Sequence, residues 1–157
     1  MTPIFKKLNF KQQPEILILN APVEFEGELE AIAQDTTVNH AIHADGEFDF
    51  LLAFVKTKAD IDQITPMVRE KLRADPVVWF AYPKGSSKKY RAEINRDQGW
   101  EILGQLGFEA VRQVAIDDDW SAIRFREVEF IKAMNRRQDF AMSEHGKQRT
   151  GHSSKKQ

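Results

Sequence analysis

Short apolar runs bounded by proline or polar residues dominate the hydrophobic pattern of the chain. The three strongest lie at residues 15–20, 48–55 and 76–83, and the last of them is enclosed by Pro76 and Pro83. An uninterrupted apolar run of this length is typical of a strand that is buried on both faces of a sheet. The pattern therefore predicts the central strands of an α/β domain.

Apolar side chains recur at helical spacing between these runs, in residues 23–34 and again after Thr57. Thr57 and Asp60 have the spacing of a helix capping pair, so the second helix is expected to begin there. Pro66 lies inside this helix and would either kink it or, with Thr65 as a cap, start another helix. A strand, helix, strand order predicts a right-handed parallel crossover.

The weaker features of the chain complete this pattern. Residues 38–42 alternate as a short, half-buried strand does, and Asn95 with Gln98 resembles a capping pair for a helix that ends at Gly107. Two alternating runs then follow, at 109–116 and 120–126.

The Asp-rich turn between these two runs predicts an antiparallel hairpin, and residues 127–140 have the spacing of a last helix. The predicted fold is a Rossmann-like three-layer α/β sandwich, with a mostly parallel sheet that ends in this hairpin.

Length, charge and composition narrow the class of protein. The 157 residues suit one core, and we expect a single domain over residues 1–141 followed by a basic, disordered tail over 142–157. From Asn135 onward six Lys or Arg face two Asp or Glu, so the net charge of −1 divides into +4 there and −5 before it. The tail could contact nucleic-acid phosphates, but it has no aromatic residue after Phe140, so a solubility role is favoured.

Other compositional features concern location and cofactors. The chain contains no cysteine, which excludes disulfides, thiolate nucleophiles and Cys-ligated metals. Neither a secretory signal nor a run of about 20 apolar residues is found, so we expect a cytoplasmic protein without a membrane segment. No cofactor or metal is indicated by any motif.

A basic loop follows the third apolar run, at the position where open α/β sheets bind ligands at a reversal in strand order. Glycine permits close backbone approach, and the positive charges would attract an anion such as phosphate. The alternative is a solvated basic turn, because the P-loop spacing is missing. The residues expected at this anion site are Lys84, Gly85, Ser86, Lys88, Lys89 and Arg96.

A second group of candidate polar residues, Asp117, Trp120 and Arg124, lies in and after the hairpin turn. Carboxylates could bind a hard cation, but no further ligands are in sequence reach, so a capped turn is favoured. Trp120 beside arginine could bind a ligand by stacking and charge, and a core edge with a salt-bridged arginine explains the pattern equally well.

No complete catalytic set is recognisable, so the sequence favours a non-catalytic module that binds a protein or an anionic small molecule. A degenerate transferase and a nucleic-acid accessory protein acting through the tail are the alternatives.

Residues 82–86 (YPKGS) and 117–126 (DDDWSAIRFR) together resemble the signature of a family of small bacterial proteins known only as a domain of unknown function. This resemblance covers most of residues 15–126 and implies a compact bacterial protein, without assigning catalytic residues.

The element order from Phe48 onward is also similar to the second half of the sheet of S-adenosylmethionine-dependent methyltransferases. After the first strand, residues 20–25 (NAPVEF) stand where those enzymes carry a glycine-rich turn.

Overall fold

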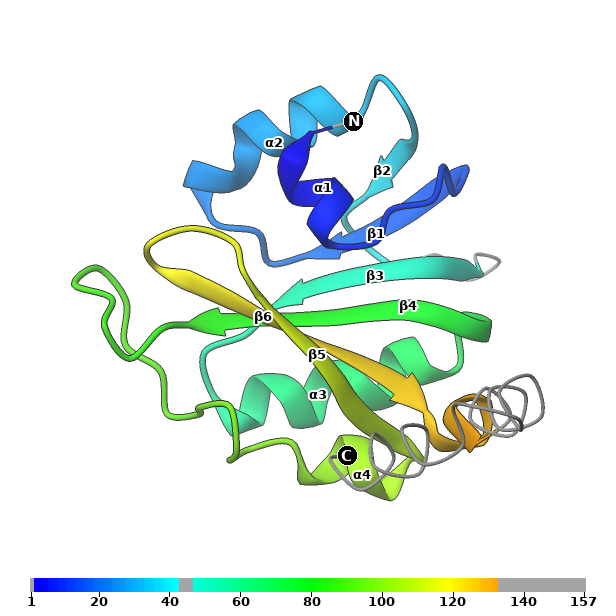
Figure 1. Ribbon diagram of the computed structural model, residues 1–157, viewed down its shortest axis with the longest axis vertical. Coiled ribbons are helices and arrows are strands. Elements are labelled where there is room, and N and C mark those ends of the chain that lie inside the picture. Colours follow the sequence, from blue (N-terminus) through cyan, green and yellow to red (C-terminus); the bar gives the residue numbers. More distant parts are fainter. Residues whose placement is uncertain (1, 43–46, 133–157) are drawn as a thin grey trace, which may run out of the picture.

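The computed structural model describes residues 2–42 and 47–132, which form one six-stranded sheet with helices on both faces (Figure 1). The strand order is β2-β1-β3-β4-β6-β5. The strands are β1 (Glu15–Leu19), β2 (Thr37–Asn39), β3 (Phe48–Phe54), β4 (Leu72–Pro83), β5 (Phe108–Ala115) and β6 (Trp120–Glu127). The helical elements are α1 (Pro3–Lys7), the 3₁₀ turn η1 (Val23–Phe25), α2 (Glu26–Ile32), α3 (Lys58–Arg69) and α4 (Glu101–Gln105).

The first four strands of this order are parallel, and β6 pairs antiparallel with both β4 and β5. The predicted three-layer sandwich with a closing antiparallel hairpin is therefore confirmed. The predicted strand at 38–42 is shorter, since β2 ends at Asn39, and β4 begins four residues before Pro76. Among the described residues, no helix combines the length and the apolar character needed to cross a bilayer.

Each face of the sheet has its own apolar layer. We call the side packed by α1 and α2 the α1 face; it receives Ile16 and Ile18 of β1. The opposite side, packed by α3 and α4, receives Leu17 of the same strand. This division follows from the alternation of side chains along a strand, and it explains why the central strands are apolar without interruption.

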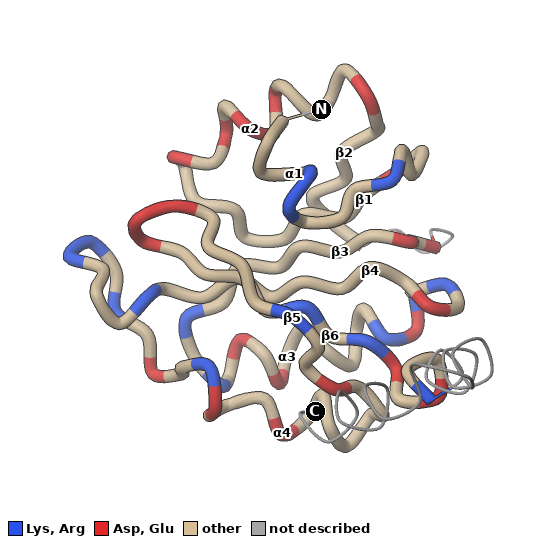
Figure 2. Tube along the Cα trace, viewed as in Figure 1, with Lys and Arg blue, Asp and Glu red and all other residues tan. Residues whose placement is uncertain are grey.

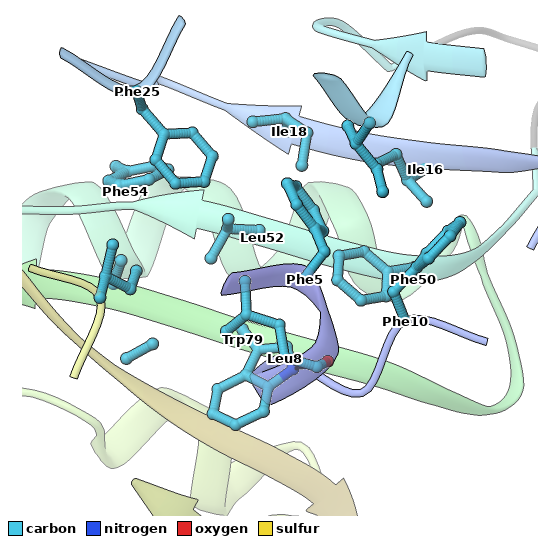
Figure 3. Packing of buried hydrophobic residues seen from close by; sticks show 14 of the residues in the cluster. Phe5, Leu8, Phe10, Ile16, Ile18, Phe25, Phe50, Leu52, Phe54 and Trp79 are labelled. Atoms are coloured by element: carbon cyan, nitrogen blue, oxygen red, sulfur yellow. Dashed lines mark hydrogen bonds between the residues drawn. The ribbon is translucent and has the colours of Figure 1, made fainter. Parts of the chain in front are cut away.

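The N-terminal segment is part of the core, which the sequence pattern did not predict. Thr2 caps α1 through a hydrogen bond from the Phe5 backbone N–H to its hydroxyl (3.2 Å). Phe5 and Leu8 are fully buried on the α1 face, where Phe5 lies beside Phe50 (Figure 3). The indole N–H of Trp79 donates to the Leu8 carbonyl (2.7 Å) and so links this segment to β4.

Helix α3 begins at the predicted capping pair. The Thr57 hydroxyl accepts from the Asp60 backbone N–H, and the Asp60 carboxylate accepts from the Thr57 N–H. The helix runs through Pro66 to Arg69, so the predicted second start at Thr65 is wrong. Thr65 instead donates its hydroxyl to the Ile61 carbonyl (2.7 Å), a bond within the helix.

The predicted start of α4 is wrong as well. Asn95 and Gln98 do not cap the helix: their backbones pair in a short antiparallel bridge, and α4 begins only after Trp100. Gly99, with a φ of 106°, turns the chain between the bridge and the helix. Gly107 follows the C-cap with a φ of 89°, as predicted.

The C-terminal predictions are only partly within reach of the structure. The chain is helical over residues 128–132, in agreement with the start of the predicted last helix. The remainder of that helix and the basic tail at 142–157 lie outside the described residues. The domain boundary at residue 141 and a nucleic-acid role for the tail therefore stay predictions.

Candidate functional site

The strand order reverses at β1, because the chain passes from β1 to β2 on one side and then returns to β3 on the other. In open α/β sheets such a reversal leaves a crevice outside the carboxyl ends of the two strands. An open cavity of about 300 Å³ lies there. Its apolar lining is Leu19, Ala41, Ile42, Ile64 and Met67, and its polar lining is Asn20, Asp60 and Gln63.

A second cavity, of about 470 Å³, adjoins the first, since Asn20, Asp60 and Gln63 line both. Its other lining residues include Lys56, Tyr90 and Trp120. We call the two cavities together the switch-point cleft. It spans the carboxyl ends of β1 and β3 and the first turns of α3.

The turn after β1 forms the floor of this cleft without a glycine. Asn20 adopts a φ of 58°, a left-handed conformation that asparagine tolerates better than most residues. Pro22, two residues later, has no backbone N–H to donate. The turn therefore has the sharp bend of a ligand-binding turn but fewer donors for a phosphate.

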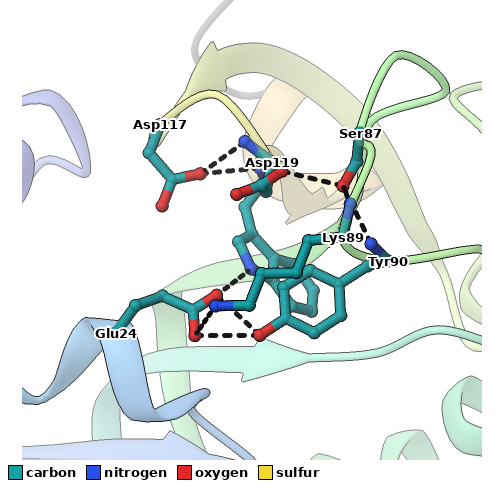
Figure 4. A network of polar contacts seen from close by, with 7 residues as sticks. Glu24, Ser87, Lys89, Tyr90, Asp117 and Asp119 are labelled. Atoms are coloured by element: carbon teal, nitrogen blue, oxygen red, sulfur yellow. Dashed lines mark hydrogen bonds and ion pairs between the residues drawn. The ribbon is translucent and has the colours of Figure 1, made fainter.

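Glu24, in η1, is the centre of a polar network at the side of the cleft (Figure 4). Its carboxylate accepts from the Tyr90 hydroxyl at 2.6 and 2.8 Å and from the Trp120 indole N–H at 3.4 Å. The Lys89 ammonium lies 3.4 Å from the same carboxylate. These contacts attach the loop after β4 to the first turn after β1.

The network shifts the pKa values of both of its principal partners. The Tyr90 hydrogen bond is the main cause that lowers the pKa of Glu24 from 4.5 to about 2, with desolvation acting in the opposite direction. The same bond raises the pKa of Tyr90 from 10.0 to about 12. The contact is therefore made by an ionised carboxylate and a neutral phenol over the whole neutral range.

This pairing predicts a stability profile with two edges. The folded pKa of Glu24 is depressed, so its contribution is complete above pH 4.5 and is lost as the pH falls toward 2. The folded pKa of Tyr90 is raised, so its contribution is complete below pH 10 and is lost as the pH rises toward 12. In melting temperatures measured against pH, Tyr90→Phe should differ most from wild type between these edges. A difference that stays constant from pH 2 to 12 would contradict the pairing, and Lys88→Gln in the same loop serves as the control.

The predicted anion loop follows β4, the strand beyond β3, so the expectation that it lies at the reversal of strand order is wrong. It rests on the hairpin turn instead: the Lys84 N–H donates to the Asp119 carbonyl and the Ser87 hydroxyl to the Asp119 carboxylate, both at 2.8 Å. A cavity of about 400 Å³ beside the loop is lined by Lys84, Gly85 and Arg91, among others.

The remaining residues predicted for that anion site are not brought together in one place. Lys89 points to Glu24 and belongs to the polar network beside the switch-point cleft (Figure 4). Ser86, Lys88 and Arg96 are not among the residues that line the cavity at the loop.

Asp117 and Trp120 lie at the cleft side of the sheet, whereas Arg124 does not. The Asp117 carboxylate accepts the backbone N–H groups of Asp119 and Trp120, both at 2.8 Å, so it caps the turn. Trp120 is buried beside Phe54 and borders the cleft. Arg124 is paired with Trp79 in the middle of β4, away from the carboxyl edge.

Four residues in or beside the cleft do not follow from the sequence pattern. The helical spacing of residues 23–34 leaves Glu24 outside the apolar stripe, the capping pair accounts for Asp60, and no motif singles out Gln63 or Tyr90. The available signal was positional, because Glu24 follows the first central strand and Tyr90 is an aromatic residue in a basic loop. Within residues 2–42 and 47–132, no group of three or more His, Asp or Glu side chains could hold a metal ion.

Comparisons with known proteins support the fold. No family model and no curated protein matches the chain. Among solved structures, an S-adenosylmethionine-dependent methyltransferase from Aquifex aeolicus is similar with a TM-score of 0.52 and 11% identity, over 80% of this chain and 88% of the other. A ribosomal protein L11 methylase from Lactobacillus delbrueckii subsp. bulgaricus has a TM-score of 0.45 and 15% identity, over 72% and 58%. The pre-rRNA processing protein fibrillarin from Methanococcus jannaschii has a TM-score of 0.48 and 15% identity, over 81% and 70%.

The first of these likenesses extends along most of both chains, although few residues are identical. At that level of identity it concerns the arrangement of the strands and helices alone. The chain has the Rossmann-like α/β fold that is also found in an S-adenosylmethionine-dependent methyltransferase.

Proposed function

We propose that the protein is a methyltransferase-like domain that binds S-adenosylmethionine, or a closely related adenosyl compound, in the switch-point cleft. The observation that carries the proposal is the position of this cleft, at the carboxyl ends of β1 and β3 where the strand order reverses. The cavity volumes of about 300 and 470 Å³ are in the range of small-molecule sites.

The lining residues fit the parts of such a ligand. Ile42 and Met67 offer apolar surface to a purine ring, and Gln63 offers an amide for hydrogen bonds to a base or a ribose. Asp60 lines both cavities, and Glu24 lies behind Tyr90 and Trp120 at the second one, which Lys56 also lines, so carboxylates are at hand to balance a cationic ligand. This charge and the proline in the β1 turn speak against a dinucleotide, whose pyrophosphate needs backbone donors.

When bound, S-adenosylmethionine would supply a methyl group on a sulfonium for transfer to an acceptor. The contribution of this chain is to hold the nucleoside against the apolar wall and to balance the positive charge with carboxylates. Glu24 is ionised at neutral pH, because the pKa of its carboxyl is lowered to about 2, and it lies 3.4 Å from the Lys89 ammonium.

The test is a thermal and calorimetric titration of the full chain with S-adenosylmethionine, S-adenosylhomocysteine and adenosine. A ligand that binds only the native state at 100 times its Kd stabilises it by about 2.7 kcal/mol, which raises the melting temperature. Met67 is 53% exposed, so Met67→Lys should leave the fold intact while replacing apolar surface beside the purine ring by an ammonium group. We expect at least about a tenfold loss of affinity for S-adenosylmethionine, because binding would then have to desolvate this charge.

Gln105→Lys adds the same charge on an exposed position of α4, outside the cleft, and is the matched control. It should bind as the wild type does. The absence of any shift in the wild type at millimolar ligand would refute the proposal, and equal affinities of the two variants would place the ligand elsewhere.

Binding of an anionic small molecule at the loop after β4 is the second candidate function, and the cavity of about 400 Å³ at Lys84 and Arg91 favours it. In the same titration with inorganic pyrophosphate, replacing Lys84 and Arg91 together by alanine should abolish the thermal shift from this site. The double variant should retain its response to S-adenosylmethionine, which separates the two sites.

A further inference from the structure

Three arginines lie close together on the α1 face, on the two strands that end the sheet. Arg124 and Arg126 alternate with Phe125 along β6 and therefore share a face, and Arg112 of β5 stands directly opposite Arg124 in the antiparallel register. Figure 2 shows positively charged positions along β5 and β6. We call them the arginine cluster.

Like charges directly opposite each other in an antiparallel pair are unfavourable, so the cluster has a cost for the fold. The cost is greatest at Arg124. Its side chain is partly buried, and its Nε is buried without a hydrogen-bond partner among the described residues. Burial lowers the pKa of Arg124, and the charges of Arg126 and Arg112 act in the same direction.

Arg126 holds the carboxylate of Asp75 in a fork. The Nε of Arg126 donates to one oxygen of Asp75 at 2.8 Å, and its second nitrogen donates to the other oxygen at 2.7 Å. Arg112 is exposed and forms no ion pair with any residue that the structure describes. Glu109 stands opposite Arg126 in the register, so two carboxylates against three guanidinium groups leave the cluster with an excess of one positive charge.

Among the described residues the cluster is partly exposed, since Arg112 is exposed and Arg124 is half-buried. Helices α3 and α4 pack on the opposite face, and on this face α1 lies over the neighbouring strands (Figure 1). The Lys7 side chain reaches from α1 to the carbonyl of Ala115 in β5 (3.0 Å), which adds a further cation beside the cluster.

We propose that Arg112 and Arg124 bind a phosphate group on this face. A carboxylate has two oxygens and fits one guanidinium, as Asp75 does with Arg126. A phosphate has further acceptor oxygens, so it can receive hydrogen bonds from two arginines whose Cβ atoms are about 4.5–5.5 Å apart across the strands. It would also offset the repulsion between these two like charges, which stand opposite each other in the register.

The ligand that we propose for these arginines is either a small phosphate compound or the phosphodiester backbone of a single-stranded nucleic acid. The same two arginines would recognise both.

The experiment titrates the full chain with inorganic pyrophosphate and with a single-stranded oligouridylate, and follows the melting temperature and the Kd. Arg112→Gln and Arg124→Met should each weaken the binding at least about tenfold, as expected for the loss of a bidentate charged contact. Lys58→Gln removes one exposed positive charge from the first turn of α3, on the opposite side of the sheet, so it is the matched control and should change Kd less than about twofold.

Arg124→Met has a second readout, which a purely structural arginine would not show. Removing a buried, unpaired donor that is flanked by like charges should leave the melting temperature unchanged or raise it, while binding is lost. A lower melting temperature with unchanged affinity assigns Arg124 to the fold and overturns the proposal. Binding that survives both substitutions, or no binding by the wild type, overturns it as well.

The two ligands separate the two sources of phosphate. If nucleic acid is the ligand, the oligouridylate binds more tightly than pyrophosphate and its Kd rises steeply with salt. If a small phosphate compound is the ligand, pyrophosphate binds at least as tightly and competes with the oligouridylate. S-adenosylmethionine binding should be unaffected by either arginine variant, so this proposal and the proposed function fail independently.

Discussion

Phe5→Ala is expected to lower the free energy of unfolding by about 3–5 kcal/mol, the usual cost of emptying a buried phenylalanine site. Phe5 is fully buried, and its ring lies 6.0–6.2 Å from the rings of Phe10, Phe25 and Phe50. Helix α1 has five residues and cannot be stable alone, so it depends on this contact. Since the free energy of unfolding of a single domain is only about 5–15 kcal/mol, the variant should be close to unfolding.

Urea denaturation followed by circular dichroism measures this effect. Lys6→Ala changes the neighbouring residue on the exposed side of the same helix and is the control, with an expected change within about 0.5 kcal/mol. If Phe5→Ala cost no more than Lys6→Ala, α1 would not be part of the core. The melting temperature should fall in the same order.

The strands at the centre of the sheet were predictable because their environment is uniform. β3 and the second half of β4 are covered on both faces, so the sequence there is apolar at nearly every position and ends abruptly. The N-terminal segment has no such signature. Phe5, Leu8 and Phe10 are separated by a lysine pair and an asparagine, over too few residues for a helical period to be visible.

The errors around α4 and in the site have a common physical cause. Asn95 has the residue type of a cap, but its side-chain oxygen accepts from Asp97 and its backbone pairs with Gln98, so tertiary packing decides against a helix there. Glu24 has the spacing of a solvent-facing helical residue. Its role comes from Tyr90, 66 residues later in the chain, and local patterns do not report such contacts.

Contacts between distant parts of the chain also determine which side chains meet at each proposed ligand site. Parallel pairing of β1 and β3 places Asn20 and Asp60 in one cleft, while antiparallel pairing of β5 and β6 places Arg112 opposite Arg124. The sequence predicted both sheet types, but the register between strands had to be observed. The two proposed ligand sites of this chain thus depend on strand pairing rather than on a contiguous motif.

Gly99→Ala is the second substitution for which we expect a large effect, a loss of about 2–4 kcal/mol from backbone strain together with overpacking. Gly99 has a φ of 106°, which L side chains rarely adopt. A Cβ placed there would lie 2.4 Å from Cγ2 of Ile94 and 3.8 Å from Cδ1 of Ile61. Both of these side chains are buried on the side of the sheet that α3 and α4 cover, so neither can move without opening the core.

Gly104→Ala is the matched control, because a Cβ at Gly104 meets nothing within 4 Å and the residue lies inside α4. That variant should be about 0.5–1 kcal/mol more stable than the wild type, since alanine restricts the unfolded chain and favours the helix. Urea denaturation should therefore show that the same Gly→Ala change shifts the free energy of unfolding in opposite directions in the two variants. Equal effects would show that the bend at Gly99 is not required for the fold.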